Sequence, residues 1–173
     1  MNLAERVRAV PDFPVPGILF RDITPLLGDA AALREAVDRM SDAWRDARVD
    51  MVAAMEARGF IFGAAIAYRL GAGFVPVRKE GRLPWQTYSA QYELEYRSDV
   101  LHIHRDALRP GQKVLVVDDL VATGGTAKAV VELVEKLGGD VVGLGFLIEL
   151  SDLRGRELLK DYPVKSVLEF EGD

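Results

Sequence analysis

The sequence contains no cysteine. Disulfide bonds, thiolate metal sites, iron–sulfur clusters and a cysteine nucleophile are therefore excluded as sources of stability or chemistry. The absence fits a reducing compartment.

Long hydrophobic runs are also missing. The longest uncharged apolar stretches, residues 59–68 and 141–148, are shorter than the ~20 residues that a membrane-spanning helix needs. Residues 1–8 have the pattern of an amphipathic helix start and not of a signal peptide. We therefore expect a cytoplasmic protein with no membrane partner.

The chain has no excess of basic residues. Lys and Arg number 22 against 27 Asp and Glu, which gives a formal net charge of −5 and argues against a nucleic-acid partner. The hydrophobic and charged fractions, 49% and 28%, are those of an ordinary globular protein. At 173 residues the chain predicts one domain, residues 1–173.

Short apolar runs alternate with helical periodicity from residue 49 onward. We predict strands at 49–55, 73–77, 88–96, 100–104, 114–117, 141–148 and 165–170, with helices at 60–70, 125–137 and 152–161. Fully apolar strands separated by helices are typical of a parallel sheet that is covered on both faces. The expected fold class is α/β, a mostly parallel open sheet flanked by helices.

The first 30 residues do not follow this alternation, and we treat them as a separate N-terminal hood segment. A short helix is predicted over residues 3–10, followed by a proline-rich loop at 11–17 that we expect to pack against the protein because it is too apolar for a solvated linker. Asp29 is positioned to cap a helix that extends to about Arg48. That helix has an apolar face, which we interpret as core packing: Leu33, Val37, Met40 and Trp44.

Residues 114–126 carry the strongest functional signal. Four apolar residues are followed by two carboxylates, Asp118 and Asp119, and then by a loop of small and hydroxyl residues that leads into a helix. Ligands of open parallel sheets bind beyond the carboxyl ends of the strands, and backbone amides at a helix start bind anions. Carboxylates accept hydrogen bonds from sugar hydroxyls, so the pattern favours a sugar phosphate over the alternative of an ordinary capped helix.

These thirteen residues resemble the phosphoribosyl-pyrophosphate (PRPP) signature of type I phosphoribosyltransferases. They match neither a Walker loop nor a dinucleotide-binding fingerprint. Within that family the chain resembles the adenine-specific branch over nearly its whole length, through residues 13–27, 57–63 and 92–96.

The resemblance implies transfer of phosphoribose from PRPP to adenine, which gives AMP and pyrophosphate. It implies that Asp118 and Asp119 hold the ribose hydroxyls and that the loop binds the 5′-phosphate through Ala122, Thr123, Gly124, Gly125 and Thr126. It also implies Mg²⁺ that arrives with PRPP and is held mainly by its oxygens and by water, without a protein metal cage, and a homodimer.

Five residues are expected near pyrophosphate. By the match these are Arg58 with Gly59, where the missing side chain allows close backbone approach, and a cationic group of Arg78, Lys79 and Arg82 at the start of a polar, mobile loop at 79–89. One or more of these cations is expected to act across the dimer interface. For each cation taken singly, a solvated surface position is an equal alternative. Glu80 departs from a more basic pattern in some relatives.

The resemblance places adenine against the hood segment. The backbone of Leu19 and Arg21 is expected at the base edge, with Phe20 and Leu120 on its two faces. For Phe20 the alternative is a simple core aromatic. Glu95 is expected to handle the proton at the imidazole-ring nitrogens of adenine.

Other residues near Glu95 give weaker signals. Glu93 and Asp99 are also acidic, and only the resemblance of Leu94-Glu95-Tyr96 to the family selects Glu95. Arg97 stands where the family often has glycine, in a predicted turn at 97–99. His102 and His104 share one strand face, and we interpret them as structural residues because no third metal ligand is evident.

Two other functions remain open. One is a phosphoribosyltransferase for another purine base, which the adenine-type hood disfavours. The other is a regulator that binds PRPP or a nucleotide without turnover, since one fold can host several functions.

Overall fold

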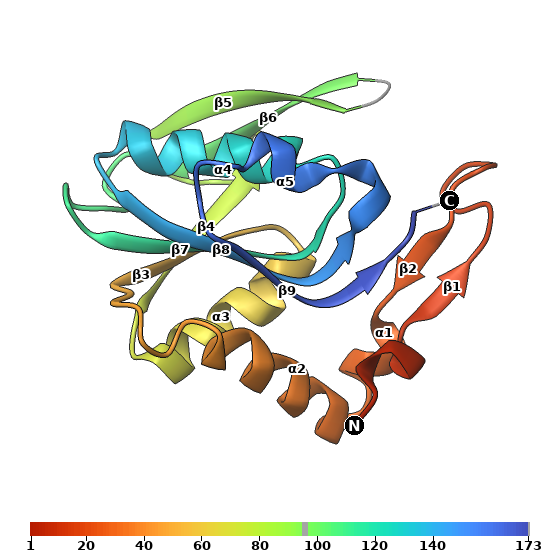
Figure 1. The fold of residues 1–173 in the computed structure, drawn as a ribbon. Coiled ribbons are helices and arrows are strands. Elements are labelled where there is room, and N and C mark those ends of the chain that lie inside the picture. Colours follow the sequence, from red (N-terminus) through yellow and green to blue (C-terminus); the bar gives the residue numbers. More distant parts are fainter. Residues whose placement is uncertain (95–96, 173) are drawn as a thin grey trace.

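The computed structural model describes residues 1–94 and 97–172. Its centre is a seven-stranded sheet with strand order β5-β6-β4-β3-β7-β8-β9 (Figure 1). Five strands run parallel: β3 (Met51–Met55), β4 (Gly73–Lys79), β7 (Lys113–Val121), β8 (Asp140–Leu150) and β9 (Val164–Phe170). A hairpin of β5 (Thr87–Leu94) and β6 (Arg97–His104) adds an antiparallel edge. The predicted mostly parallel α/β fold is confirmed.

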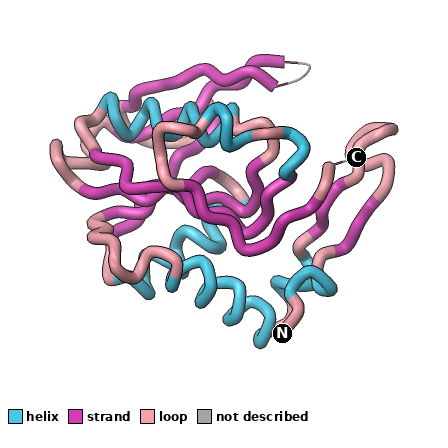
Figure 2. The backbone as a smooth tube through the Cα atoms, viewed as in Figure 1, coloured by secondary structure: helices cyan, strands magenta, loops and turns pink. Residues whose placement is uncertain are grey.

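Helices cover both faces of this sheet (Figures 1 and 2). α2 (Ala30–Asp42) and α3 (Arg58–Leu70) lie on one face, and α4 (Gly125–Lys136) lies on the other. In β7, Leu115 and Val117 pack toward α2 and α3, whereas Val114 and Val116 pack toward α4. Burial on both faces explains the unbroken apolar run that precedes the two carboxylates.

The hood segment adds a separate two-stranded sheet beside the central one (Figure 1). A 3₁₀ helix, η1 (Leu3–Arg6), precedes β1 (Arg8–Val10), which pairs antiparallel with β2 (Phe20–Asp22), and α1 (Thr24–Leu27) follows. The predicted helix over residues 3–10 is therefore wrong after Arg6. The backbone of residues 8–10 instead forms its hydrogen bonds with β2, a strand that begins ten residues after Val10. Local periodicity does not predict this pairing.

The proline-rich loop also differs from its prediction. Residues 11–17 are all exposed, and Phe13 and Val15 keep 50% and 48% of their surface accessible. Phe13 nevertheless contacts the edge of the Phe20 ring, with centroids 5.1 Å apart. The loop thus packs on the hood itself and not on the body of the protein.

Helix boundaries are confirmed at their starts more often than at their ends. Asp29 caps α2 by accepting hydrogen bonds from the amides of Ala31 and Ala32, as predicted, but the helix ends at Asp42 and not near residue 48. Trp44 is buried although it lies beyond that end.

The predicted helix at 152–161 is reduced to two short pieces, η2 (Ser151–Leu153) and α5 (Gly155–Leu158). Arg154 separates them in a left-handed conformation, φ 54°. The predicted turn at 97–99 is also wrong, because Arg97 already pairs with Leu94 in the hairpin. No helix in the described part of the chain is long and apolar enough to cross a membrane.

Candidate active site

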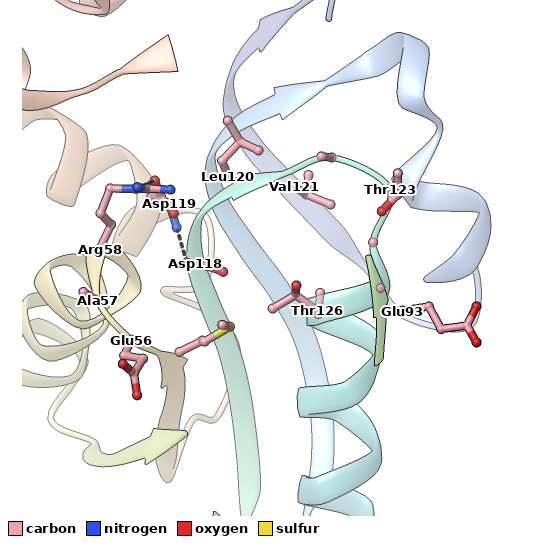
Figure 3. A pocket seen from close by; sticks show the side chains of 15 residues that line it. Glu56, Ala57, Arg58, Glu93, Asp118, Asp119, Leu120, Val121, Thr123 and Thr126 are labelled. Carbon is pink, nitrogen blue, oxygen red and sulfur yellow. Dashed lines mark hydrogen bonds and ion pairs between the residues drawn. The ribbon is translucent and has the colours of Figure 1, made fainter. Parts of the chain in front are cut away.

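A cleft of about 310 Å³ opens beyond the carboxyl ends of β3 and β7 (Figure 3). Most of its lining comes from the chain segments that join β3 to α3 and β7 to α4, and β5 adds one residue. Its lining residues include Glu56, Arg58, Glu93 and all of residues 118–127. Because β3 and β7 are parallel neighbours, the chain segments that follow them meet at one sheet edge.

The two carboxylates of β7 both line this cleft and have different surroundings. The side chain of Asp119 is only 8% exposed and accepts a hydrogen bond from Arg58 Nε at 2.5 Å. Asp118 Oδ1 accepts the backbone N–H of Asp119 at 2.8 Å. Burial, together with the negative charge of Asp119 beside it, raises the pKa of Asp118 well above the ordinary value.

The loop predicted to bind phosphate follows directly. Residues 122–126 all line the cleft and lead into the first turn of α4. Gly124 has φ 88°, a left-handed conformation that favours glycine, and it precedes the helix as its N-cap residue. Backbone amides at such a helix start are oriented to bind an anion. The structure therefore brings the acid pair and the small-residue loop together, as the sequence predicted.

Arg58 and Gly59 begin α3 on the opposite wall. Besides its ion pair with Asp119, the Arg58 guanidinium lies 5.4 Å from the centroid of the Phe20 ring. A Cβ atom at Gly59 would lie 2.7 Å from Asp118 Oδ1. The close approach at Gly59 is thus made by Asp118, a contact that no sequence pattern indicated.

The cationic group lies at the end of β4 and beyond, beside this wall. Arg78 donates from Nε to Glu56 Oε1 at 3.1 Å, and Lys79 Nζ lies 3.3 Å from Asp99 Oδ2. Arg82 is exposed. Glu56 also accepts the backbone N–H of Lys79 at 2.9 Å. Sequence reasoning missed Glu56, although its position just after a buried strand was a usable signal.

The hood contacts the cleft wall through Phe20, whose ring lies beside the Arg58 guanidinium. Phe20 is half-buried in β2, between Phe13 and Arg58, so it is not part of the protein core. Leu120 lines the cleft, and Leu19 is half-buried. The Arg21 side chain extends away, donates to the Glu171 carbonyl at 2.8 Å and stacks on Phe170, which ties the hood to the C-terminal strand.

Similarity to known proteins agrees with this geometry. Residues 27–173 match the family model of the phosphoribosyl transferase domain. The adenine phosphoribosyltransferase of Thermotoga neapolitana is 58% identical, over 97% of this chain and 99% of that protein. The chain belongs to the adenine phosphoribosyltransferase family.

Solved structures of adenine phosphoribosyltransferases have the same fold. That of Thermoanaerobacter pseudethanolicus superposes with a TM-score of 0.95 at 52% identity, over 97% of this chain and 98% of that one. That of Saccharomyces cerevisiae, complexed with adenine and an imino-altritol bisphosphate, gives a TM-score of 0.90 at 39% identity, with 96% of each chain covered.

Glu95, the residue that the adenine phosphoribosyltransferase match selects for proton handling, lies outside the described residues. Its neighbour Glu93 is exposed at the rim of the cleft, and its carboxylate points away from Thr126 in Figure 3. His102 Nδ1 lies 2.9 Å from Thr87 Oγ1, in keeping with a structural role. In residues 1–94 and 97–172, no three His, Cys, Asp or Glu side chains form a group that could hold a metal ion.

Proposed function

We propose that this protein transfers the 5-phosphoribosyl group of PRPP to adenine, giving AMP and pyrophosphate. The observation that carries the proposal is the shared cleft of Asp118, Asp119 and the loop 122–126. Membership of the adenine phosphoribosyltransferase family supports the choice of base.

In this proposal the loop amides bind the 5′-phosphate and the two carboxylates accept hydrogen bonds from the ribose hydroxyls. Cleavage of the anomeric bond generates positive charge on the ribose, which nearby anionic groups stabilise. Arg58 is half exposed, at 51% of its side chain, and can therefore contact pyrophosphate while it keeps its ion pair with Asp119. Gly59, Arg78, Lys79 and Arg82 complete the proposed pyrophosphate side.

Mg²⁺ fits the donor set of this cleft. PRPP and water would supply most of its oxygen ligands, and the carboxylate oxygens of Asp118 and Asp119, a ligand type that Mg²⁺ prefers, line the same cleft. The chemistry that Mg²⁺ would supply there is positive charge beside the leaving pyrophosphate.

The proposed adenine site lies between the hood and the cleft. Phe20 and Leu120 cover the two faces of the base, and the backbone at Leu19 and Arg21 reads its edge. Phe20 already contacts Arg58 on the cleft wall, which supports a hood contribution to base binding. Glu95 is proposed to exchange the proton of the imidazole ring as the glycosidic bond forms.

A homodimer in the cytoplasm is part of the proposal. Large apolar side chains are exposed on α3 and after β4, which supports an interface: Ile61, Tyr68 and Trp85 are exposed by 41%, 91% and 66%. Light scattering of the purified protein tests the dimer, and fractionation of cells tests the location. A single-chain mass would contradict the dimer.

The decisive experiment incubates the purified protein with PRPP, Mg²⁺ and one purine base at a time, and separates the products by chromatography. AMP formed from adenine supports the proposal, and chelation of Mg²⁺ should abolish it. A nucleotide formed only from hypoxanthine, guanine or xanthine would assign another purine specificity. Binding without any product would indicate a regulator.

A further inference from the structure

The loop proposed to bind phosphate rests on a second backbone segment behind it. A Cβ atom at Gly155 would lie 2.5 Å from the Ala122 carbonyl oxygen and 3.2 Å from the Gly124 nitrogen. Conversely, a Cβ atom at Gly124 would lie 2.7 Å from the Gly155 oxygen. Backbone therefore packs directly on backbone, and a displacement of Gly155 must displace the loop.

The segment that contains Gly155 has little stability of its own. α5 has four residues, and the preceding Arg154 has a left-handed conformation. One helical turn of this length does not persist in water without tertiary contacts. The position of Gly155 therefore depends on what holds α5 to the sheet.

Arg156, the residue after Gly155, makes that connection. Its Nε and one terminal nitrogen donate to the two carboxylate oxygens of Glu149, each at 2.6 Å, and its other terminal nitrogen donates to the Val164 carbonyl at 2.6 Å. Ser166 adds a hydrogen bond from Oγ to Glu149 Oε2 at 2.5 Å. A bidentate arginine–carboxylate pair fixes distance and direction together.

Glu149 is itself placed next to the site. It is 7% exposed in β8, and in the sheet register it pairs with Val121, the last residue of β7 before the loop. The Arg156 guanidinium and the Ser166 hydroxyl lower the pKa of Glu149, so the pair is charged. The loop is thus held by β7, which precedes it, and by Gly155 at the start of α5. Glu149 contacts both supports, because it pairs with Val121 of β7 and binds Arg156 of α5.

We propose that Arg156 is a positioning residue for the site of the 5′-phosphate: through Glu149 it holds Gly155 against residues 122–124. The inference rests on the proposed function, which assigns PRPP to this loop. Arg156 is not assigned any contact with substrate. Its removal should therefore weaken binding of the phosphate end and leave the adenine side intact.

The test compares Arg156→Lys, which keeps the charge and loses the bidentate fork, with Arg154→Lys as the matched control. Arg154 is exposed on the same segment, with Glu157 as its partner at 3.7 Å. We expect Arg156→Lys to raise KM for PRPP by about tenfold and to change KM for adenine by less than about twofold. Arg154→Lys should change neither KM. Equal increases in both KM values, or an unchanged KM for PRPP in folded protein, would overturn the proposal.

Glu149→Gln provides an independent arm, because it keeps the side-chain shape and removes the charge. Glu149→Gln should also raise KM for PRPP. The double variant should have a KM for PRPP no higher than that of the more impaired single variant. Additive effects in the double variant would count against a shared mechanism. Thermal unfolding of each variant identifies any that fails to fold, and the folded members of the set decide the outcome.

A binding measurement separates this proposal from the catalytic one. Ribose 5-phosphate serves as the probe, and calorimetry measures its dissociation constant for wild type, Arg156→Lys and Arg154→Lys. If the wild type made no AMP, the proposed activity would be wrong, yet a weaker affinity confined to Arg156→Lys would still support the positioning role. Equal affinities in all three proteins would refute that role.

Discussion

Arg58 Nε lies 2.5 Å from Asp119 Oδ2 and joins the start of α3 to the end of β7 across the cleft. The acid is nearly buried, whereas half of the arginine side chain remains open to solvent. The pair therefore neutralises a carboxylate that would otherwise repel a polyanionic substrate, and it leaves guanidinium donors available. The contact joins the two walls of the cleft in which PRPP is proposed to bind.

Replacing Asp119 with Asn should reduce kcat/KM for PRPP. The change weakens the charged hydrogen bond of Asp119 to Arg58 and the proposed one to a ribose hydroxyl. Each such bond contributes about 1.5–3 kcal/mol, so the loss of one should lower kcat/KM about ten- to a hundredfold. Steady-state kinetics measure it, with Asp106→Asn on the exposed surface as the control. Equal kinetics in the two variants would contradict the assignment.

Glu95→Gln should slow turnover far more than Glu93→Gln. A general acid or base contributes about 10²–10⁴-fold to rate, and the match assigns that task to Glu95 alone. Glu93 is exposed at the cleft rim, so its amide variant should leave kcat close to wild type. Comparable losses in kcat for the two variants would contradict the assignment of proton transfer to Glu95.

Gly59→Ala should lower both stability and PRPP affinity. The new Cβ would meet Asp118 Oδ1 at 2.7 Å and force that carboxylate or the start of α3 to move. Overpacking of this kind costs about 1–3 kcal/mol in the free energy of unfolding, which denaturant titration measures.

Gly28→Ala is the control for that substitution. Its Cβ would meet its nearest neighbour, the Thr24 oxygen, at an ordinary 3.4 Å, and Gly28 has a φ of −77° that alanine adopts freely. Its free energy of unfolding should not fall. A Gly59→Ala variant as stable as Gly28→Ala would show that the helix start yields without strain.

Asp118→Asn should stabilise the protein at neutral pH while it impairs the proposed reaction. The pKa of Asp118 is raised in the folded state, so between the unfolded value near 3.8 and the folded pKa the unfolded chain binds fewer protons. The free energy of unfolding therefore falls as pH rises through that window. The amide side chain of the variant does not ionise, so the variant does not lose this stability.

The difference in Tm between Asp118→Asn and wild type measures this effect. The difference should be positive at neutral pH and should narrow as the pH falls through about 3.8, because below that value the carboxyl group is protonated in the unfolded state as well. A difference in Tm that does not change with pH would show that burial of a charge is not its cause.

The order of elements along the chain could be predicted well because each signal is local. Apolar runs bounded by glycine and proline marked the strands, and the Asp29 side chain caps the helix that directly follows it. Predictions were wrong where distant pairing decides. Residues 8–10 form a strand because residues 20–22 lie beside them. Residues 152–161 contain only the end of η2 and the four-residue α5, although their composition allows a continuous helix.

The sequence alone determined the chemistry at one place, the end of β7, because the acid pair and the small-residue loop are contiguous and leave the sheet together. Only the tertiary structure decided what surrounds that place. The Arg58–Asp119 pair spans 61 residues, and the contacts of Gly59 with Asp118 and of Gly155 with Ala122 join separate elements. Such contacts depend on how strands align across the sheet, and strand order is a property of the whole packed core that no local pattern contains.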